Sequence, residues 1–276
     1  MEGASATAAG IPYVMRAALS SDRRGTVVYV HGGGMVYGSM RDYPECSVRR
    51  FLNEGFDILS IGYPLAPETG LAAIVESTAA CLIELMDEGV IDGEAYYAFG
   101  RSAGTFLWVA LIDRLKQAQR SLPRAFLAFY GYASLRHLRL FEPDQCYRAD
   151  HPIAQDVAFG LIRTKPVFDD LAMERLLLYV FARQQGMMGT LLDVSPDELD
   201  AYDFEHGSER ELPPTFATWC ALDDEVDPAA SRALCALSPD CTTWVVDARG
   251  HDYDQMVDTP AYEELMRRLL AWLKER

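Results

Sequence analysis

The chain has 276 residues, of which half are apolar, and a formal net charge of −16 at pH 7. A chain of this length and composition can bury a sizeable core as a single domain. The negative charge argues against nucleic acid and anionic membrane surfaces as partners, because both would repel the protein. The six cysteines are scattered without metal-ligand spacing, so we expect reduced and mostly buried thiols.

The first ten residues are small and polar, and they carry neither a basic start nor a long apolar run. Because this is not the pattern of a secretory signal or a membrane anchor, we expect a cytoplasmic protein. We interpret residues 1–10 as a flexible tail that precedes the folded part of the chain.

Short apolar runs typical of strands alternate with helical patterns along most of the chain. The predicted strands cover residues 11–19, 26–31, 56–61, 95–100, 125–130, 214–220 and 242–247. The predicted helices cover residues 41–54, 70–88, 103–120, 228–237 and 259–275. This alternation predicts an α/β fold, in which a mostly parallel, doubly wound sheet has helices on both faces.

A glycine-rich loop follows the strand predicted over 26–31, with the sequence His31-Gly32-Gly33-Gly34. Glycines let the backbone approach a ligand closely, so that free N–H groups can point at a developing negative charge. The loop therefore predicts an oxyanion hole, and the alternative is a flexible turn. We expect His31 to hold this loop by hydrogen bonding rather than to act as a base.

The pentapeptide Gly100-Arg101-Ser102-Ala103-Gly104 lies between a predicted strand and a predicted helix. In a G-x-S-x-G elbow the chain turns sharply from strand to helix and exposes the serine hydroxyl at the top of the sheet. The pattern alone is moderately specific, and its strand-to-helix context strengthens it. We predict that Ser102 is a nucleophile.

A serine nucleophile needs a base, and the base needs a carboxylate that orients it. His251 follows the strand predicted over 242–247, and Asp223 follows the strand predicted over 214–220. Both lie at the carboxyl ends of predicted strands, where open α/β sheets place their sites. The order serine, acid, histidine is the order of the α/β-hydrolase triad.

Other acids and histidines have alternative roles. Asp224, Glu225 and Asp227 share the loop with Asp223, which we prefer because it leaves the strand first. Asp227 precedes Pro228 and could cap the following helix. For the histidines of the polar middle segment we expect solvated or structural roles; they are His137, His151 and His206.

Three motifs, with the segments of the predicted acid and base, together resemble the hormone-sensitive-lipase-like branch of the α/β-hydrolases, which are esterases with an HGGG motif. They are 31–39 with the glycine loop, 63–68 with the sequence Tyr-Pro-Leu-Ala-Pro-Glu, 100–104 with the serine elbow, and the segments around Asp223 and His251. The resemblance implies a serine hydrolase that cleaves carboxylic esters through an acyl-enzyme. It implies no metal or organic cofactor, and a small-molecule ester as the substrate.

The resemblance also implies the role of each residue. Ser102 is the nucleophile, His251 is the general base and acid, and Asp223 is the orienting carboxylate. The implied oxyanion donors are the backbone N–H groups of Gly32, Gly33 and Ala103.

Three departures from the family pattern bear on the substrate. Arg101 replaces the usual acidic residue beside the serine, and its charge could favour an anionic substrate or pair with a neighbouring carboxylate. Pro64 replaces an arginine, so any ion pair of that arginine is lost. The N-terminus offers one strand candidate where the family commonly has a hairpin and a cap helix. Our candidates for contact with the substrate are Met35 and Arg101.

Segment 134–212 breaks the alternation and is too long for a connecting loop. Its stretch 170–184 is a strongly apolar helix candidate. Because the family carries an insertion that caps the active site, we interpret 134–212 as a helical cap on a core of 11–133 and 213–276. The alternatives for the apolar helix are core packing and the face of a homodimer.

Two other classes of function stay open. A serine peptidase or amidase would use the same triad, but it needs a site, usually acidic, for the amine end of its substrate. A non-catalytic binding protein could share the fold, although all three members of the triad are present. Among esters we expect short acyl chains, because an acidic protein without an exposed apolar anchor is poorly suited to lipid interfaces.

Overall fold

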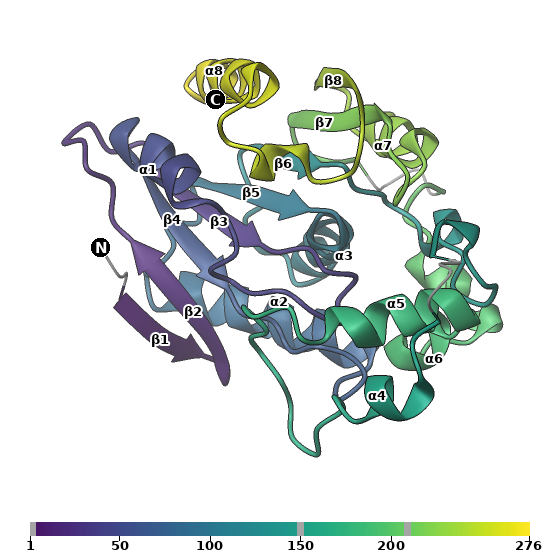
Figure 1. Ribbon diagram of the computed structural model, residues 1–276. Coiled ribbons are helices and arrows are strands. Elements are labelled where there is room, and N and C mark those ends of the chain that lie inside the picture. Colours follow the sequence, from purple (N-terminus) through teal and green to yellow (C-terminus); the bar gives the residue numbers. More distant parts are fainter. Residues whose placement is uncertain (1–3, 148–151, 207–210) are drawn as a thin grey trace.

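A sheet of eight strands runs through the described part of the chain (Figure 1). The computed structural model describes residues 4–147, 152–206 and 211–276. The strands are β1 (Ala4–Ala8), β2 (Ile11–Arg16), β3 (Gly25–Val30), β4 (Phe56–Ile61), β5 (Tyr96–Arg101), β6 (Phe126–Phe129), β7 (Thr215–Leu222) and β8 (Cys241–Arg249). Their order across the sheet is β1-β2-β4-β3-β5-β6-β7-β8, and the pairs from β4 to β8 are parallel. The predicted α/β class with a mostly parallel sheet is confirmed.

Helices cover both faces of this sheet. Outside the inserted segment they are α1 (Glu45–Asn53), α2 (Leu71–Asp87), α3 (Ala103–Gln117), α7 (Pro228–Cys235) and α8 (Pro260–Leu273). Figure 1 shows α1 and α8 on one side and α2 and α3 on the other. Hydrogen bonding joins α1 to α8, because the hydroxyl groups of Ser47 and Tyr262 lie 2.7 Å apart.

Two of these helices begin where the sequence supplies a cap. The Asp227 side chain accepts a hydrogen bond from the N–H of Ala229 at 2.8 Å, and Pro228 takes the first helical position of α7. Thr259 caps α8 in the same way, with Pro260 next. Proline suits this position because its missing N–H would have no partner in the first turn.

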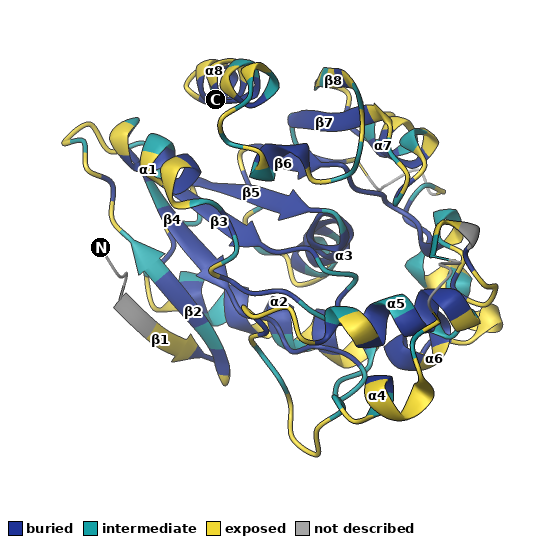
Figure 2. Ribbon diagram, viewed as in Figure 1, coloured by how far each residue is buried: buried dark blue, intermediate teal, exposed yellow. Residues whose placement is uncertain are grey.

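The central parallel strands bring the two predicted motifs together. β3, β5 and β6 are nearly continuous apolar runs, and they are almost entirely buried (Figure 2). A parallel sheet covered on both faces requires this pattern. The register pairs Val30 with Gly100, so the glycine loop after β3 and the serine elbow after β5 leave the sheet side by side.

Residues 4–10 correct our expectation of a flexible tail over residues 1–10, of which residues 1–3 lie outside the described residues. Ala4–Ala8 forms β1, which pairs with β2 as an antiparallel hairpin at the edge of the sheet. Ala9 and Gly10 make the turn with φ values of 47° and 77°, as a type I′ hairpin turn requires. The sequence hid this strand because its side chains are small and Ala-Gly is a weaker turn signal than Asn-Gly. The family's hairpin is therefore present.

The segment between β6 and β7 is built from short helices. They are η1 (Leu135–His137), η2 (Gln145–Tyr147), α4 (Gln155–Phe159), α5 (Leu176–Gln185), α6 (Met188–Leu192) and η3 (Pro196–Tyr202). The helix predicted over 170–184 begins only at Leu176. Before it, Asp170 donates its N–H to Gly38 at 2.9 Å, and its carboxylate accepts the N–H groups of Glu174 and Arg175. Figure 1 shows α4, α5 and α6 grouped beyond the arrowheads of the central strands.

The cysteines are all free, as expected, but their burial differs from the prediction. Cys81 and Cys220 are buried, whereas Cys46 and Cys146 are exposed. Separately, no helix among the described residues is long and apolar enough to cross a membrane.

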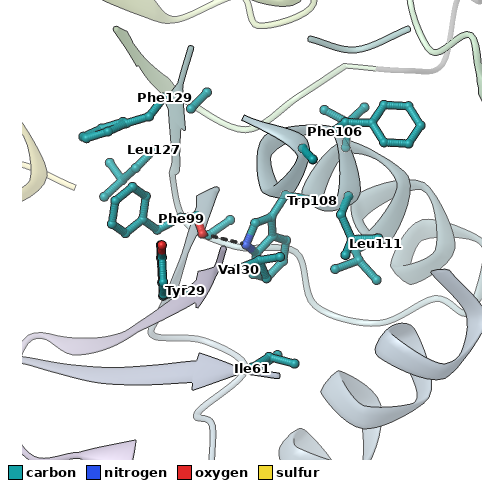
Figure 3. Close-up of a cluster of buried hydrophobic side chains, with 14 of the residues drawn as sticks. Tyr29, Val30, Ile61, Phe99, Phe106, Trp108, Leu111, Leu127 and Phe129 are labelled. Atoms are coloured by element: carbon teal, nitrogen blue, oxygen red, sulfur yellow. Dashed lines mark hydrogen bonds between the residues drawn. The ribbon is translucent and has the colours of Figure 1, made fainter. Parts of the chain in front are cut away.

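Trp108 is a large residue of the core, in a cluster that includes Val30, Phe106 and Leu111 (Figure 3). It is fully buried on α3, and its indole N–H donates to the carbonyl of Phe99 on β5 at 3.1 Å. The helix that follows the elbow is thus fastened to the strand that precedes it by packing and by a hydrogen bond.

We expect Trp108→Ala to lower the free energy of unfolding by about 3–5 kcal/mol, because it leaves a cavity and removes the hydrogen bond to the Phe99 carbonyl. Urea denaturation followed by circular dichroism measures this change. The control is Val157→Ala on α4, whose side chain is 51% exposed and should change stability by less than about 0.5 kcal/mol. An effect of Trp108→Ala no larger than that of the control would contradict the role of Trp108 in fastening α3 to β5.

Candidate active site

Ser102 is the single residue between β5 and α3. Its backbone angles, φ 51° and ψ −120°, lie outside the regions that L-residues favour. Strain of this kind costs about 1–3 kcal/mol and persists only where the surroundings impose it. The Ser102 N–H donates to Phe129 of β6 at 2.9 Å, and its carbonyl accepts from Thr105 at 2.9 Å. The sheet and the first turn of the helix therefore hold the serine in this conformation.

The last glycine of the elbow is required because two segments of the chain approach each other closely here. A Cβ atom on Gly104 would lie 2.2 Å from the carbonyl oxygen of Val30 and 2.5 Å from that of His31. The first turn of α3 thus lies directly against the end of β3. Any larger residue would push the helix, and Ser102 with it, away from the glycine loop.

The structure brings the three predicted triad residues together. His251 Nε2 lies 2.9 Å from Ser102 Oγ, and Nδ1 lies 2.7 Å from Asp223 Oδ2. The other carboxylate oxygen of Asp223 accepts the N–H groups of Glu225 and Val226 at 2.9 and 3.0 Å. The Asp223 side chain is buried, so its orientation is fixed by these bonds. This is the geometry of a serine nucleophile, a base and an orienting acid.

The surroundings of His251 favour its protonated form. Burial by itself lowers the pKa of the imidazole, but the hydrogen bond and charge of Asp223, with Glu225 and Asp252 nearby, raise the pKa above its ordinary value. A base with a raised pKa accepts a proton more readily. The carboxylates therefore favour proton transfer from Ser102 to His251.

The glycine loop presents backbone donors next to the serine. A Cβ atom on Gly32 would lie 3.3 Å from the Cβ of Ser102. Within the described residues, the N–H groups of Gly32, Gly33 and Ala103 have no hydrogen-bond partner. Free N–H groups beside a nucleophile can stabilise an oxyanion, as the sequence predicts.

His31 lies in the wall behind this loop. It is fully buried, its Nδ1 lies 3.0 Å from the carbonyl oxygen of Gly32, and burial lowers its pKa, so it is neutral. Tyr63 stacks on the imidazole at 4.2 Å and donates to the carbonyls of His31 and Gly32. These contacts match the expectation that His31 holds the loop.

Sequence reasoning missed Arg175, which comes from the inserted segment. Its guanidinium forms a buried ion pair with Glu68 at 2.7 Å and donates to the carbonyl of Val36 at 2.8 Å. Pro64 cannot make an ion pair, but Glu68 of the same motif pairs with an arginine from the inserted segment. No local pattern could have paired residues that are 107 positions apart.

Two cavities meet at Ser102. The larger, of about 450 Å³, also reaches His251, Tyr37 and Gln255. The smaller, of about 20 Å³, lies on the side of the inserted segment. Its lining residues include Met35, Tyr132, Leu140, Met188 and Leu192. Ser102 thus faces a roomy space on one side and a small space on the other.

Tyr179 and Glu225 border both cavities, and sequence reasoning assigned a role to neither. The Tyr179 hydroxyl donates to Glu225 at 3.2 Å and accepts from Arg183 at 2.7 Å. A Cβ atom on Gly34 would lie 2.4 Å from the Tyr179 ring. The third glycine of the loop therefore makes room for a tyrosine of α5, which separates the two spaces.

The two predicted substrate contacts have different surroundings. Met35 is buried and lines the smaller cavity. Arg101 is buried at the floor of the larger cavity, where its Nε lies 3.0 Å from Asp254 Oδ2. The geometry favours pairing with a carboxylate over binding of an anionic substrate, because the guanidinium charge is already neutralised.

His137 and His206 lie outside this site. His137 pairs with Glu205 at 2.6 Å, and His206 pairs with Asp203 at 2.9 Å. His151 lies outside the described residues. In the described ranges, no group of histidine, cysteine and acidic side chains could hold a metal ion.

Known proteins share this fold and parts of this sequence. An acetyl-hydrolase from Streptomyces hygroscopicus is 32% identical over 110 residues, which are 40% of this chain and 36% of that protein. The match thus spans little more than a third of the relative's length. An α/β-hydrolase superfamily protein from Enterococcus faecalis has a crystal structure with a TM-score of 0.89 and 28% identity, and the match covers 99% of both chains.

An esterase of the bacterial hormone-sensitive lipase family has the same fold, with a TM-score of 0.72 at 20% identity over 99% of this chain and 84% of that chain. The model of a family with the α/β-hydrolase fold matches residues 27–182, which make up more than half of the chain. The predicted family is confirmed by these matches. The chain belongs to the α/β-hydrolase family.

Proposed function

We propose that the protein is a serine hydrolase that cleaves carboxylic esters with short acyl groups through an acyl-enzyme on Ser102. The observation that carries this proposal is the unbroken chain of contacts from Ser102 through His251 to Asp223, at 2.9 and 2.7 Å. The acetyl-hydrolase relative and the esterase with the same fold support the choice of esters.

In the proposed reaction Ser102 attacks the ester carbonyl while His251 takes the hydroxyl proton. The N–H groups of Gly32, Gly33 and Ala103 stabilise the oxyanion; a comparable donor in a serine protease contributes about 2.7–4 kcal/mol. His251 then returns the proton to the departing alcohol. Water enters, His251 activates it, and attack on the acyl-enzyme releases the acid and restores Ser102.

The size of the smaller cavity supports a short acyl group. At about 20 Å³ it offers room for little more than an acetyl-sized group, and apolar side chains from the inserted segment close it. The alcohol side of the ester would then occupy the larger cavity of about 450 Å³. We propose that segment 134–212 is a cap, and that it separates the acyl side of the site from the alcohol side.

A second candidate is an amidase. The larger cavity is lined by the carboxylates of Asp42, Asp170, Glu225 and Asp252, which would suit a substrate with an amine. Relative rates on a p-nitrophenyl ester and the matching p-nitroanilide separate the two activities. Faster turnover of the anilide would favour the amidase.

We expect wild-type protein to hydrolyse p-nitrophenyl acetate and butyrate faster than the octanoate, because longer chains exceed the smaller cavity. Ser102→Ala should lower kcat by at least about 10⁴-fold. The measurement is release of p-nitrophenol across the series, with circular dichroism to show that the variant is folded. Ser121→Ala, at an exposed serine that lines neither cavity, is the matched control. Equal activity of Ser102→Ala and the wild type would exclude the proposed nucleophile.

Met188→Ala should widen the smaller cavity, because Met188 is buried and lines it. We expect the ratio of kcat/KM for butyrate over acetate to rise about tenfold, which is typical of a pocket that gains one or two methylene groups. Met256→Ala, at a methionine that is 57% exposed, is the control. An unchanged ratio in Met188→Ala would mean that the acyl group binds elsewhere.

The acid limb of kcat/KM should lie above pH 6.5, because the neutral form of His251 is the base and its pKa is raised from 6.5. Activity is lost as the pH falls through this raised pKa. In Asp223→Asn the limb should move to lower pH and kcat should fall by about 10⁴-fold, because the charge and the tautomer control are both lost. Asp224→Asn, at a half-exposed neighbour, should change neither. A shifted limb and a lower kcat in Asp224→Asn, with neither change in Asp223→Asn, would identify Asp224 as the orienting acid.

A further inference from the structure

We propose that the buried ion pair of Arg101 and Asp254 is a positioning device, which holds the loop that carries His251 in register with Ser102. The proposal goes beyond the triad and rests on the proposed function for its kinetic readout. Arg101 immediately precedes Ser102, and Asp254 lies three residues after His251. The pair therefore joins the two catalytic segments at a second point, beneath the contact between Ser102 and His251.

The ion pair is fully enclosed. Arg101 Nε lies 3.0 Å from Asp254 Oδ2, and the two side chains are 5% and 0% exposed. A buried ion pair contributes little net stability, because desolvation of both charges offsets their attraction. A role in holding geometry explains such a pair better than a role in stability does.

Tyr130 links the ion pair to the imidazole. Its hydroxyl donates to Asp254 Oδ1 at 2.6 Å and accepts from Arg101 Nε at 2.6 Å. Its ring centroid lies 4.6 Å from that of His251. One side chain therefore contacts both charges of the pair and the ring of the base, so a shift of the pair would be passed to His251 by direct contact.

The guanidinium is also anchored by Tyr29 and Asp42. The Tyr29 hydroxyl of β3 accepts from Arg101 Nη1 at 3.2 Å and donates to Asp42 at 2.6 Å. Asp42 itself lies 3.6 Å from Arg101. The arginine is thus fixed to the centre of the sheet, and it offers Asp254 a rigid partner.

The loop that carries His251 has few other anchors. Asp252 and Met256 are exposed, and Gly250 has φ 124°. Its buried side chains are Tyr253, which hydrogen-bonds Thr218, and Asp254, and the half-buried Gln255 places its amide group against the Arg101 guanidinium. Without the pair of Arg101 and Asp254, Gln255 loses its partner as well, and the position of His251 would depend on Tyr253 and on its own bond to Asp223.

The test compares a charge-free double variant, Arg101→Met with Asp254→Leu, with the wild type on p-nitrophenyl acetate. Replacing both partners leaves no unpaired charge that is fully buried, because Asp42 is 27% exposed and keeps its hydrogen bond from Tyr29, so we expect a folded protein with a Tm close to that of the wild type. We expect kcat to fall about 10- to 100-fold with KM within about threefold, because a small misplacement of a catalytic group costs this much. A folded double variant that keeps wild-type kcat would overturn the proposal.

Two further variants keep the test decisive. Should the double variant fail to fold, Tyr130→Phe removes only the bridging hydroxyl, and we expect kcat to fall at least about threefold with KM unchanged. Wild-type kcat in Tyr130→Phe would then overturn the proposal. Arg120→Gln with Asp87→Asn, at an exposed ion pair on the far side of α2 and α3, is the control.

The pH profile separates an effect of the pair on His251 from a loss of folded protein. The groups that face His251 are the carboxylates of Asp223, Glu225 and Asp252, and beneath it Tyr130 with the pair of Arg101 and Asp254. Asp254→Asn leaves the arginine charge unbalanced, which lowers the pKa of the imidazole, so the acid limb should move to lower pH. A loss of folded protein alone would lower the rate at every pH and leave the limb in place, which would count against the proposal.

Failure of the proposed function is visible separately, as an absence of ester turnover by the wild type. In that case the rate at which a fluorophosphonate labels Ser102 supplies the same comparison between wild type and double variant. An equal labelling rate in the two folded proteins would overturn the positioning role whatever the substrate is.

Discussion

The active site depends on one steric constraint, the close approach of the first turn of α3 to the end of β3. Only a glycine fits at position 104, where a Cβ atom would lie 2.2 Å from the Val30 carbonyl oxygen. This contact fixes the elbow beside the glycine loop, and the elbow in turn forces Ser102 into a backbone conformation with φ 51°. The core beneath, with Trp108 fastened to β5, supplies the rigidity that keeps this strained turn in place.

The parts of the site that sequence predicted well are those that depend on local chemistry. One such pattern is a strand that runs into three glycines, and the other is a serine that lies between small residues. The physical requirement of each pattern lies within a few positions of the sequence. The order of acid and base followed from their places at strand ends, and the register of the parallel strands then brings these ends together. The hairpin over 4–16 was hidden because short side chains and an Ala-Gly turn carry little signal.

The parts that sequence did not predict arise from contacts between distant segments. Arg175 reaches Glu68, Tyr179 packs on Gly34, and Arg101 finds Asp254, and each pair is separated by more than 100 positions. An arginine in a helical pattern or beside a serine gives no sign of which carboxylate it will meet. Pairing of this kind is decided by how distant segments of the chain lie against one another in the fold, which no spacing rule describes.

The hydrogen bond between Tyr179 and Glu225 ties the choice of substrate to the machinery of the reaction. Tyr179 borders the smaller cavity, which is the acyl side in the proposed function, while the N–H of Glu225 holds the carboxylate of Asp223 at 2.9 Å. A change in the inserted segment that moves Tyr179 would therefore also disturb the loop that orients the base. Divergence toward larger acyl groups in this protein should be slow along that route, because each gain in room would be coupled to a loss in turnover.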